Sequence, residues 1–364
     1  MIKHLCLVLF LLGYLVQSQE DKPYYSFDVN NFYGTILKHN PDISHLITGH
    51  PSGILFSINR KTFGNKDWQR LYNSPDYGIS FIYQDMDNEF LGENFGLYAH
   101  YNFYFFKRVL MLRLGQGLAY NTKPYDEDNN FRNVAYGSHF MSSTFAMLNL
   151  KKENLIGGLG VQLGFGVIHY SNANFKAPNK STNTLVFNAG FNYVLDSTYP
   201  EYIKKEKGDV KGSEPISYGF MFRSGINESD VVGSGQHPFY TIAAFADKRL
   251  NKKSSVQLGA ELFFSEALKK FIDFRSTGDF EDGTTGDEDS KRVGVFLGHE
   301  LRINKISILT QLGYYVYYPY DFEGQVYNRF GARYYFNKNI FGSITVRSHA
   351  AKAEAVEFSI GYRL

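Results

Sequence analysis

Apolar and polar residues alternate with a period of two along most of this chain, which limits it to a β-rich fold. The end of the chain shows the pattern most clearly. Val356, Phe358, Ile360, Tyr362 and Leu364 are apolar, and polar or small residues lie between them. In a strand, such alternation places one face against an apolar environment and the other against a polar one. A terminal strand of this kind is typical of outer-membrane barrels, although a soluble β-sandwich can end in the same way.

Similar segments recur along the chain, and two kinds of connection separate them. Many segments are about 10–15 residues long, which suffices to cross a bilayer at a tilt of about 45°. Short basic or polar turns, such as 106–108 and 151–154, contrast with long polar loops, such as 123–135 and 267–290. This asymmetry is expected of a barrel that is inserted from the periplasm. The expected strands are 27–37, 51–61, 76–86, 93–106, 109–122, 136–150, 155–171, 183–197, 215–226, 238–248, 254–266, 291–303, 306–319, 325–336, 340–349 and 354–364.

Composition excludes several other classes of protein. The 28 Tyr and 33 Phe make the chain too aromatic for a disordered protein. The net charge of +2 argues against a nucleic-acid binder held by charge. Beyond the N-terminus, no stretch approaches the roughly 18 apolar residues that a spanning helix needs. A transmembrane β-barrel stays allowed, because its alternating strands average out to polar.

The first residues, 1–18, have the pattern of an export signal. A short basic region precedes an apolar core at 5–16, and small or apolar residues at 16–18 suit cleavage. We therefore expect the mature chain to begin near Gln19, with a retained membrane anchor as the alternative. Cys6 is the only cysteine and lies inside this signal. The mature chain is thus predicted to have no disulfide, no thiolate nucleophile and no Cys-based metal site.

The chain also repeats itself. His50-Pro51 is echoed by His237-Pro238, and Leu114-Gly115 by Leu312-Gly313, in the same order and with similar flanks. Echoes in order favour a duplication. Our main expectation is one antiparallel transmembrane barrel of about 12–16 strands, with two tandem eight-stranded barrels as the alternative. The expected parts are a first half (19–197), a charged connection (198–214) and a second, degenerate half (215–364).

Segment 155–171 contains residues that suggest chemistry. Its apolar residues fall on odd positions, and the same register places His169 and Ser171 on that face, about 6.6 Å apart along a strand. In a barrel this face meets lipid. The return strand places Asn183 on the same face. One interpretation is a polar barrel rim; the other is a hydrolase in which His169 deprotonates Ser171 and a third group orients the His.

The same segment resembles the active-site segment of the outer-membrane lipid A 3-O-deacylases, the PagL family. The resemblance rests on residues 168–173, Lys176 and 178–179, and a weaker likeness extends over 30–197. It implies a barrel whose outer wall carries the His base and the Ser nucleophile, and it implies lipopolysaccharide as substrate. The enzyme would remove the ester-linked acyl chain at position 3. The second half has no equivalent His-x-Ser motif.

Two positions depart from the family pattern. The family's acid falls at Asn183, whose amide oxygen can orient an imidazole but supplies no full charge. A glycine of the family falls at Asn174. We therefore expect a slower enzyme, or a different acid that reaches in. The asparagines expected to contribute an oxyanion or substrate contact are Asn172, Asn174 and Asn179.

The main functional hypothesis is a lipid A ester hydrolase in the outer membrane of a Gram-negative bacterium. Its partners would be lipopolysaccharide and outer-membrane lipids, with no nucleic acid, no cofactor and no metal, and its oligomeric state stays open. The acidic stretch 279–289 is interpreted as a solvated loop, because it lacks the EF-hand ligand order. Two alternatives remain: a pore, which rings of lumen-facing charge would favour, and a structural or binding barrel that has lost catalysis at Asn183. A contact between Ser171 and His169 on the outer wall would favour the enzyme.

Overall fold

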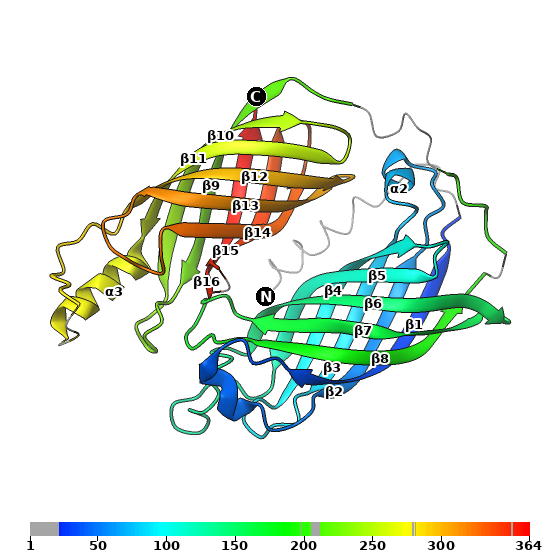
Figure 1. The fold of residues 1–364 in the computed structure, drawn as a ribbon, viewed down its shortest axis with the longest axis horizontal. Helices are drawn as coiled ribbons and strands as arrows, with labels where there is room; N and C mark the ends of the chain where they lie inside the picture. The colour runs from blue at the N-terminus through cyan, green and yellow to red at the C-terminus, as the bar shows by residue number, and fades with distance from the viewer. Residues whose placement is uncertain (1–21, 197, 205–211, 279, 281, 351) are drawn as a thin grey trace, which may run out of the picture.

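Two separate barrels form the molecule (Figure 1). The computed structural model describes residues 22–364 except 197, 205–211, 279, 281 and 351, so the expected signal at 1–18 lies outside the described residues. Strands β1–β8 close into one antiparallel barrel, in which β1 pairs with both β2 and β8. Strands β9–β16 close into the second, in which β9 pairs with both β10 and β16. Each barrel uses both edges of its first strand, so the expected single barrel is wrong and the tandem alternative is confirmed.

The strands follow the predicted periodicity, and each expected segment overlaps one of them. The first barrel contains β1 (Tyr25–Ile36), β2 (Ser52–Arg60), β3 (Asp76–Asp85), β4 (Glu93–Phe105), β5 (Leu110–Asn121), β6 (Phe140–Ile156), β7 (Leu159–Ser171) and β8 (Thr182–Val194). The second contains β9 (Ile216–Asn227), β10 (His237–Arg249), β11 (Ser254–Ser265), β12 (Arg292–Ile303), β13 (Ile306–Tyr317), β14 (Val326–Tyr335), β15 (Ile340–His349) and β16 (Lys352–Arg363). The helices are η1 (Pro41–Leu46), α2 (Asp67–Leu71) and α3 (Glu266–Thr277). Within the described ranges, no helix is both long and apolar enough to cross a membrane.

One turn lies elsewhere than expected. The charged residues 151–154 belong to β6, and the chain reverses at Gly157 and Gly158 instead. Both glycines have positive φ, 57° and 91°, which a glycine adopts without steric cost. A register shift between Lys152 and Ile156 absorbs the extra residues. Charge is therefore a poorer turn signal here than a glycine pair.

The sequence echoes fall at equivalent places in the two barrels. His50-Pro51 directly precedes β2, and His237-Pro238 opens β10, so both mark the second strand of a barrel. Leu114-Gly115 lies in β5 and Leu312-Gly313 in β13, the fifth strand of each barrel.

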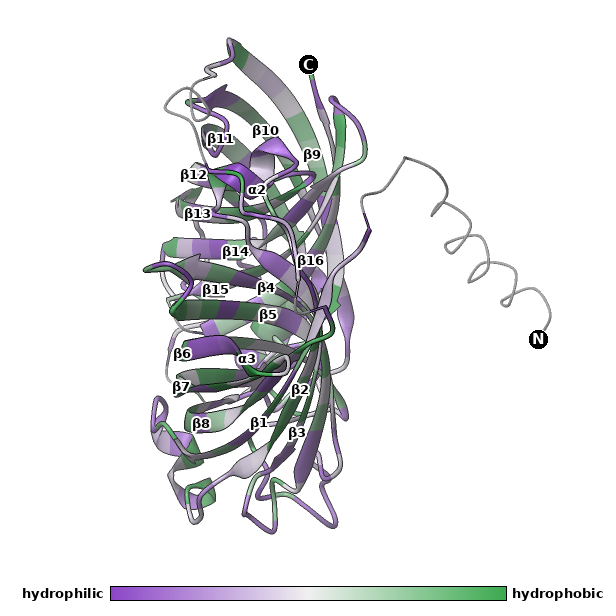
Figure 2. Cartoon of the chain, turned by 90° about the vertical axis from the view of Figure 1, so that its right-hand side faces the viewer, coloured by the Kyte–Doolittle hydropathy of each residue, from purple (hydrophilic) through white to green (hydrophobic). Residues whose placement is uncertain are grey.

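The outer wall is apolar, and the inner wall combines polar and charged side chains with buried apolar ones such as Phe32 and Phe145. On β7, Leu163 and Phe165 are 48% and 58% exposed, whereas Gln162 and Gly164 are buried. Phe187 on β8 is as exposed as Phe165. The strands of both barrels carry this alternation of hydrophobic and hydrophilic residues (Figure 2). Apolar side chains exposed all round a closed barrel suit a hydrocarbon surrounding.

Paired charges occupy part of each lumen, beside buried apolar clusters. In the first barrel, Lys151 Nζ lies 3.1 Å from Asp28 Oδ1. In the second, Glu261 Oε1 accepts from Arg223 Nη1 at 2.6 Å and from Arg329 Nη1 at 3.0 Å. All of these side chains are buried. An eight-stranded barrel is just wide enough for side chains to fill its interior, so inward charges do not indicate a pore in barrels this narrow.

The barrels point the same way and touch at both ends. Their long loops lie at one end, here called the loop end, and their short turns at the other, the turn end (Figure 1). At the turn end, Tyr72 Oη donates to the Arg302 carbonyl at 2.6 Å, and Lys252 Nζ lies 3.3 Å from Asp67 Oδ2. The long connection at 62–75 is thus an inter-barrel contact, which explains why it breaks the pattern of short turns at this end.

Candidate active site

The site begins with a pair of residues on neighbouring strands. His169 on β7 lies directly opposite Asn183 on β8, and its Nδ1 is 2.8 Å from Asn183 Oδ1. An amide oxygen only accepts, so we assign the ring proton to Nδ1, which leaves a lone pair on Nε2. The burial pattern of β7 places His169 on the outward row that includes Phe165 and Val167. The arrangement thus presents a neutral imidazole base on the barrel wall.

His169 belongs to a polar row that runs across the outer wall. The row consists of Gln116 on β5, Thr144 on β6, His169 and Asn183, each directly opposite the next. Gln116 makes two hydrogen bonds to β6. Gln116 Oε1 accepts from Thr144 Oγ1, and Gln116 Nε2 donates to Ser142 Oγ at 3.0 Å. The next row toward the turn end is apolar throughout: Leu114, Ala146, Val167 and Leu185. The polar row therefore interrupts the apolar outer face near its loop end, where Leu118 on β5 and Phe140 on β6 lie exposed beyond it.

Ser171 is the last residue of β7 and is 5% exposed. Its Oγ donates to Asn179 Oδ1 at 3.1 Å and accepts from the Ala173 backbone N–H at 2.9 Å. In the described part of the chain, no hydrogen bond joins Ser171 to His169. The contact between Ser171 and His169 that was expected of an enzyme is thus not made in this structure. Catalytic hydrogen bonds are often long or poorly aligned in substrate-free structures, so its lack does not decide between the alternatives.

The loop after β7 surrounds Ser171 with asparagines. Asn179 Oδ1 accepts from the Asn172 backbone N–H at 3.0 Å as well as from Ser171, and Asn179 Nδ2 donates to Asn174 Oδ1 at 3.1 Å. Asn172 Nδ2 in turn donates to the Lys176 carbonyl at 2.6 Å. The structure thus groups the three asparagines with Ser171 and places the His169–Asn183 pair beside them.

Two residues of this loop have a left-handed backbone. Ala173 has φ 50° and Asn174 has φ 60°. Asparagine tolerates this region better than other non-glycine residues do, which explains why Asn174 can stand where the resemblance places a glycine. Ala173 carries the larger steric cost. Among the described residues, the backbone N–H of Asn174 has no acceptor.

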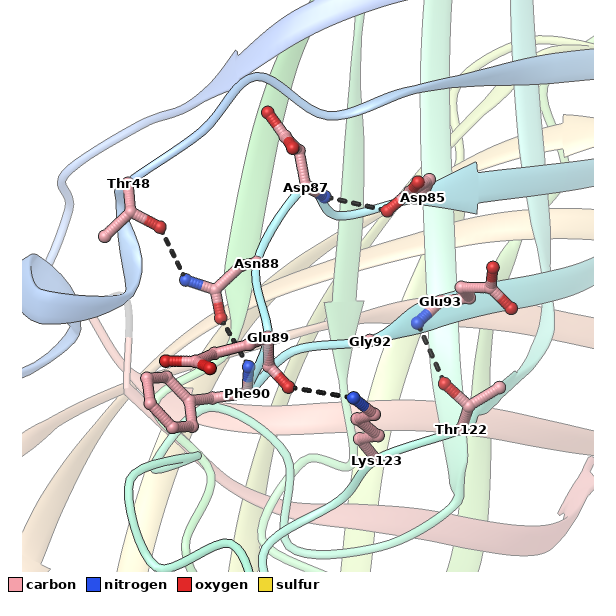
Figure 3. A pocket seen from close by; sticks show the side chains of 10 residues that line it. All are labelled: Thr48, Asp85, Asp87, Asn88, Glu89, Phe90, Gly92, Glu93, Thr122 and Lys123. Atoms are coloured by element: carbon pink, nitrogen blue, oxygen red, sulfur yellow. Dashed lines mark hydrogen bonds between the residues drawn. The ribbon is translucent and has the colours of Figure 1, made fainter.

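A separate hollow lies away from these residues. It measures about 800 Å³ and is lined by Asp85, Asp87, Glu89, Glu93 and Lys123, among others (Figure 3). The connection between β3 and β4, which supplies half of this lining, lies across the barrel from β7 and β8. Its carboxylates would repel a phosphorylated lipid. Nor do three or more His, Cys, Asp or Glu side chains of the described residues gather closely enough to hold a metal ion.

Comparison with known families accounts for both barrels. Residues 52–192 match the family described as lipid A 3-O-deacylase (PagL), and residues 216–364 match the C-terminal domain of acyloxyacyl hydrolase. The chain belongs to the PagL family. The PagL match contains β7, the loop after it and β8 up to Asn192, and the second match gives the C-terminal barrel a family domain of its own.

Solved structures and curated proteins add little to this family assignment. Several mutants of the Rh. blastica porin align at 10% identity over 93% of this chain and 100% of the porin, with a TM-score of 0.18. A chain from "Asymmetric conductivity of engineered proteins" aligns at 11% identity over 93% of this chain and 99% of its own length, also with a TM-score of 0.18. TM-scores this low carry no argument. No curated protein matches the chain.

Some residues around the PagL-like site escaped the sequence analysis. Gln116 interrupts an apolar row of its strand, so the alternation itself was a signal for it. His39 Nε2 lies 3.1 Å from the Lys180 carbonyl, at the end of the loop after β7, and no local pattern marked it. Glu228, which also contacts this loop, belongs to the second barrel.

Proposed function

We propose that this PagL-family chain is an outer-membrane lipid A deacylase that uses Ser171 as nucleophile and His169 as general base. The observation that supports this most is the hydrogen bond between His169 and Asn183 on the outer wall. His169 lies two residues before Ser171 along β7. That bond fixes the tautomer in which Nε2 is free to accept a proton. A serine with a neighbouring oriented histidine is the arrangement required for acyl transfer.

The reaction would proceed in two acyl-transfer steps. Ser171 Oγ attacks the acyl carbonyl while His169 takes its proton, and a tetrahedral intermediate forms. Its collapse breaks the ester bond, and His169 returns the proton to the leaving sugar hydroxyl. Water, deprotonated by His169, then attacks the Ser171 ester, and His169 returns this proton to Ser171 Oγ as the acyl–serine bond breaks and the fatty acid leaves. Asn183 keeps the imidazole in place throughout.

The loop after β7 would supply the oxyanion site. The Asn174 backbone N–H has no acceptor among the described residues, and it follows the Ala173 N–H that already points to Ser171 Oγ. Preorganised N–H donors of this kind stabilise the charge that develops in the transition state. Asn172 and Asn179 hold the loop closed around Ser171.

The position of the site fits a lipid substrate. The polar row lies directly above an apolar row, and a lipid A ester lies at the boundary between sugar headgroup and acyl chains. A nucleophile on the wall at that height reaches the ester without extracting the acyl chain from the bilayer.

Mass spectrometry of lipid A from cells with and without the protein tests the proposal. We expect cells that express the wild-type chain to contain lipid A lacking one ester-linked acyl chain. Cells expressing Ser171→Ala should retain the full set of chains. Identical lipid A in all three strains would contradict a deacylase.

A further inference from the structure

The second barrel reaches into the active-site loop of the first. Glu228, in the β9–β10 connection, accepts from the Ala177 backbone N–H through Oε2 at 2.8 Å. Its own backbone N–H donates to the Asn174 carbonyl at 2.8 Å. From the same connection, Gln236 Nε2 donates to the Phe175 carbonyl at 2.8 Å. Three backbone groups of the loop between Ser171 and Asn179 are therefore satisfied by the other barrel.

Glu228 ties the two loops together. It is buried, and its second oxygen, Oε1, accepts from the Gly235 backbone N–H at 3.0 Å. The carboxylate thus joins its own loop to Ala177, which is buried as well. A buried carboxylate that accepts from backbone N–H groups makes strong, directional bonds, because one partner is ionised.

A series of hydrogen bonds connects Glu228 to Ser171. Glu228 fixes the main chain of Asn174, whose side-chain Oδ1 accepts from Asn179, and Asn179 accepts the hydrogen bond of Ser171 Oγ. Ala173, between Ser171 and Asn174, has the left-handed φ of 50° that few non-glycine residues adopt. Such a conformation persists only where the surroundings over-determine it. Asn179 of the first barrel and Glu228 of the second both hold the backbone around Ala173 in this conformation.

We propose that Glu228 is a positioning residue for the nucleophile, so that the C-terminal barrel completes the active site of the N-terminal one. This inference rests on the proposed function. It assigns the second barrel a role in the reaction although that barrel carries no His-x-Ser motif. Glu228 touches neither substrate nor reacting atoms; it acts through the backbone of residues 174–177.

The test compares three variants of the full chain in detergent micelles. We expect Glu228→Ala to lower kcat for lipid A about 10- to 100-fold, the scale of a small misplacement of a reacting group, with KM within about twofold. Glu228→Gln retains one acceptor oxygen and should recover part of the loss. Glu288→Ala is the matched control. Glu288 also accepts from two backbone N–H groups, those of Thr285 and Gly286, but within its own loop, so its loss should leave kcat unchanged.

A second measurement separates positioning from folding. The rate at which a fluorophosphonate labels Ser171 reports the nucleophile directly, and heat-modifiable gel mobility reports barrel folding. We expect Glu228→Ala to label more slowly while both barrels stay folded. If Glu228→Ala does not fold, Gln236→Ala takes its place, because it removes only the bond to the Phe175 carbonyl.

The outcomes are distinct. Wild-type rates of labelling and turnover in the folded variant would overturn the positioning role and leave the proposed function intact. Equal activity of wild type and Ser171→Ala would overturn the proposed function, and this inference with it.

Discussion

The sequence resemblance places Asn183 where the PagL family carries an acid, and the Asn183 amide retains the hydrogen bond to the imidazole. Its oxygen accepts the His169 Nδ1 proton at 2.8 Å, so the ring is oriented as a carboxylate would orient it. In the proposed reaction, the amide would provide no negative charge for the imidazolium that forms during attack. Hydrogen bonds with an ionised partner are about twice as strong as neutral ones, so we expect Asn183 to stabilise the transition state less than a carboxylate would.

Substitution of Asn183 measures what the missing charge costs. Asn183→Glu should leave the deacylation rate unchanged or raise it, because it restores a carboxylate beside the imidazole. Asn183→Ala should lower the rate less than His169→Ala, whose loss of a general base costs about 10²- to 10⁴-fold. Initial rates on purified lipid A check this order. An inactive Asn183→Glu together with an active Ser171→Ala would show that the chemistry lies elsewhere.

At the scale of single residues, the strand periodicity alone predicted that His169 and Asn183 share a face. It could not predict the partners of Ser171, because Asn179 reaches Oγ through an irregular loop with two left-handed residues. The contact made by Glu228 was not predictable from the sequence for a different reason. Its contact with Ala177 joins loops of two barrels, and no local pattern encodes which loops meet.

The packing of strand β7 determines which of its two faces lies outward, toward lipid. Leu163 and Phe165 are exposed on one face, and the glycines of the other face lie against the neighbouring strand; a Cβ added at Gly164 would lie 2.1 Å from the Leu148 carbonyl oxygen. A larger residue does not fit there. The strand therefore has only one register, in which His169 faces outward, since a slip of one residue would exchange the two faces.

Charge on the outer face of β7 should cost stability according to depth. Phe165 lies in the middle of the strand, so Phe165→Arg should lower the free energy of unfolding by about 2–4 kcal/mol. Leu159→Arg, at the turn end of the same face, should cost only about 0–1 kcal/mol. Urea unfolding in lipid vesicles measures both. Equal costs for the two variants would contradict the lipid-facing register.

Strands were the easiest elements to predict, because each carries its own alternating pattern. The turn at Gly157 and Gly158 was misplaced, because the charged residues before it imitate a turn while a shift in pairing keeps them in β6. The number of barrels was not predictable from periodicity. Whether β8 returns to β1 or continues to β9 depends on edge pairing, and the alternation is the same in both cases.

Across the whole molecule, two filled barrels lie side by side with their loop ends together (Figure 1). The lumens hold paired charges such as Arg329 with Glu261, and the outer walls are apolar. Contacts at both ends, through Tyr72 and through Glu228, join the barrels. Function is therefore expected on the outer wall and at the junction of the loops, and not in a channel.

The protein should fractionate with the outer membrane and require detergent for extraction. Its gel mobility should shift on heating, because closed barrels resist unfolding in detergent until they are boiled. Membrane fractionation with gels of heated and unheated samples provides the measurement. Recovery as a soluble periplasmic protein would contradict the interpretation of the exposed apolar walls as lipid-facing.

The proposed role of Ser171 can be measured as the release of fatty acid from purified lipid A by the purified full chain. We predict that the wild-type chain releases one ester-linked acyl chain. Ser171→Ala, with the same heat-modifiable mobility, should release none above background. Release by Ser171→Ala at the wild-type rate would contradict the assignment of Ser171 as the nucleophile.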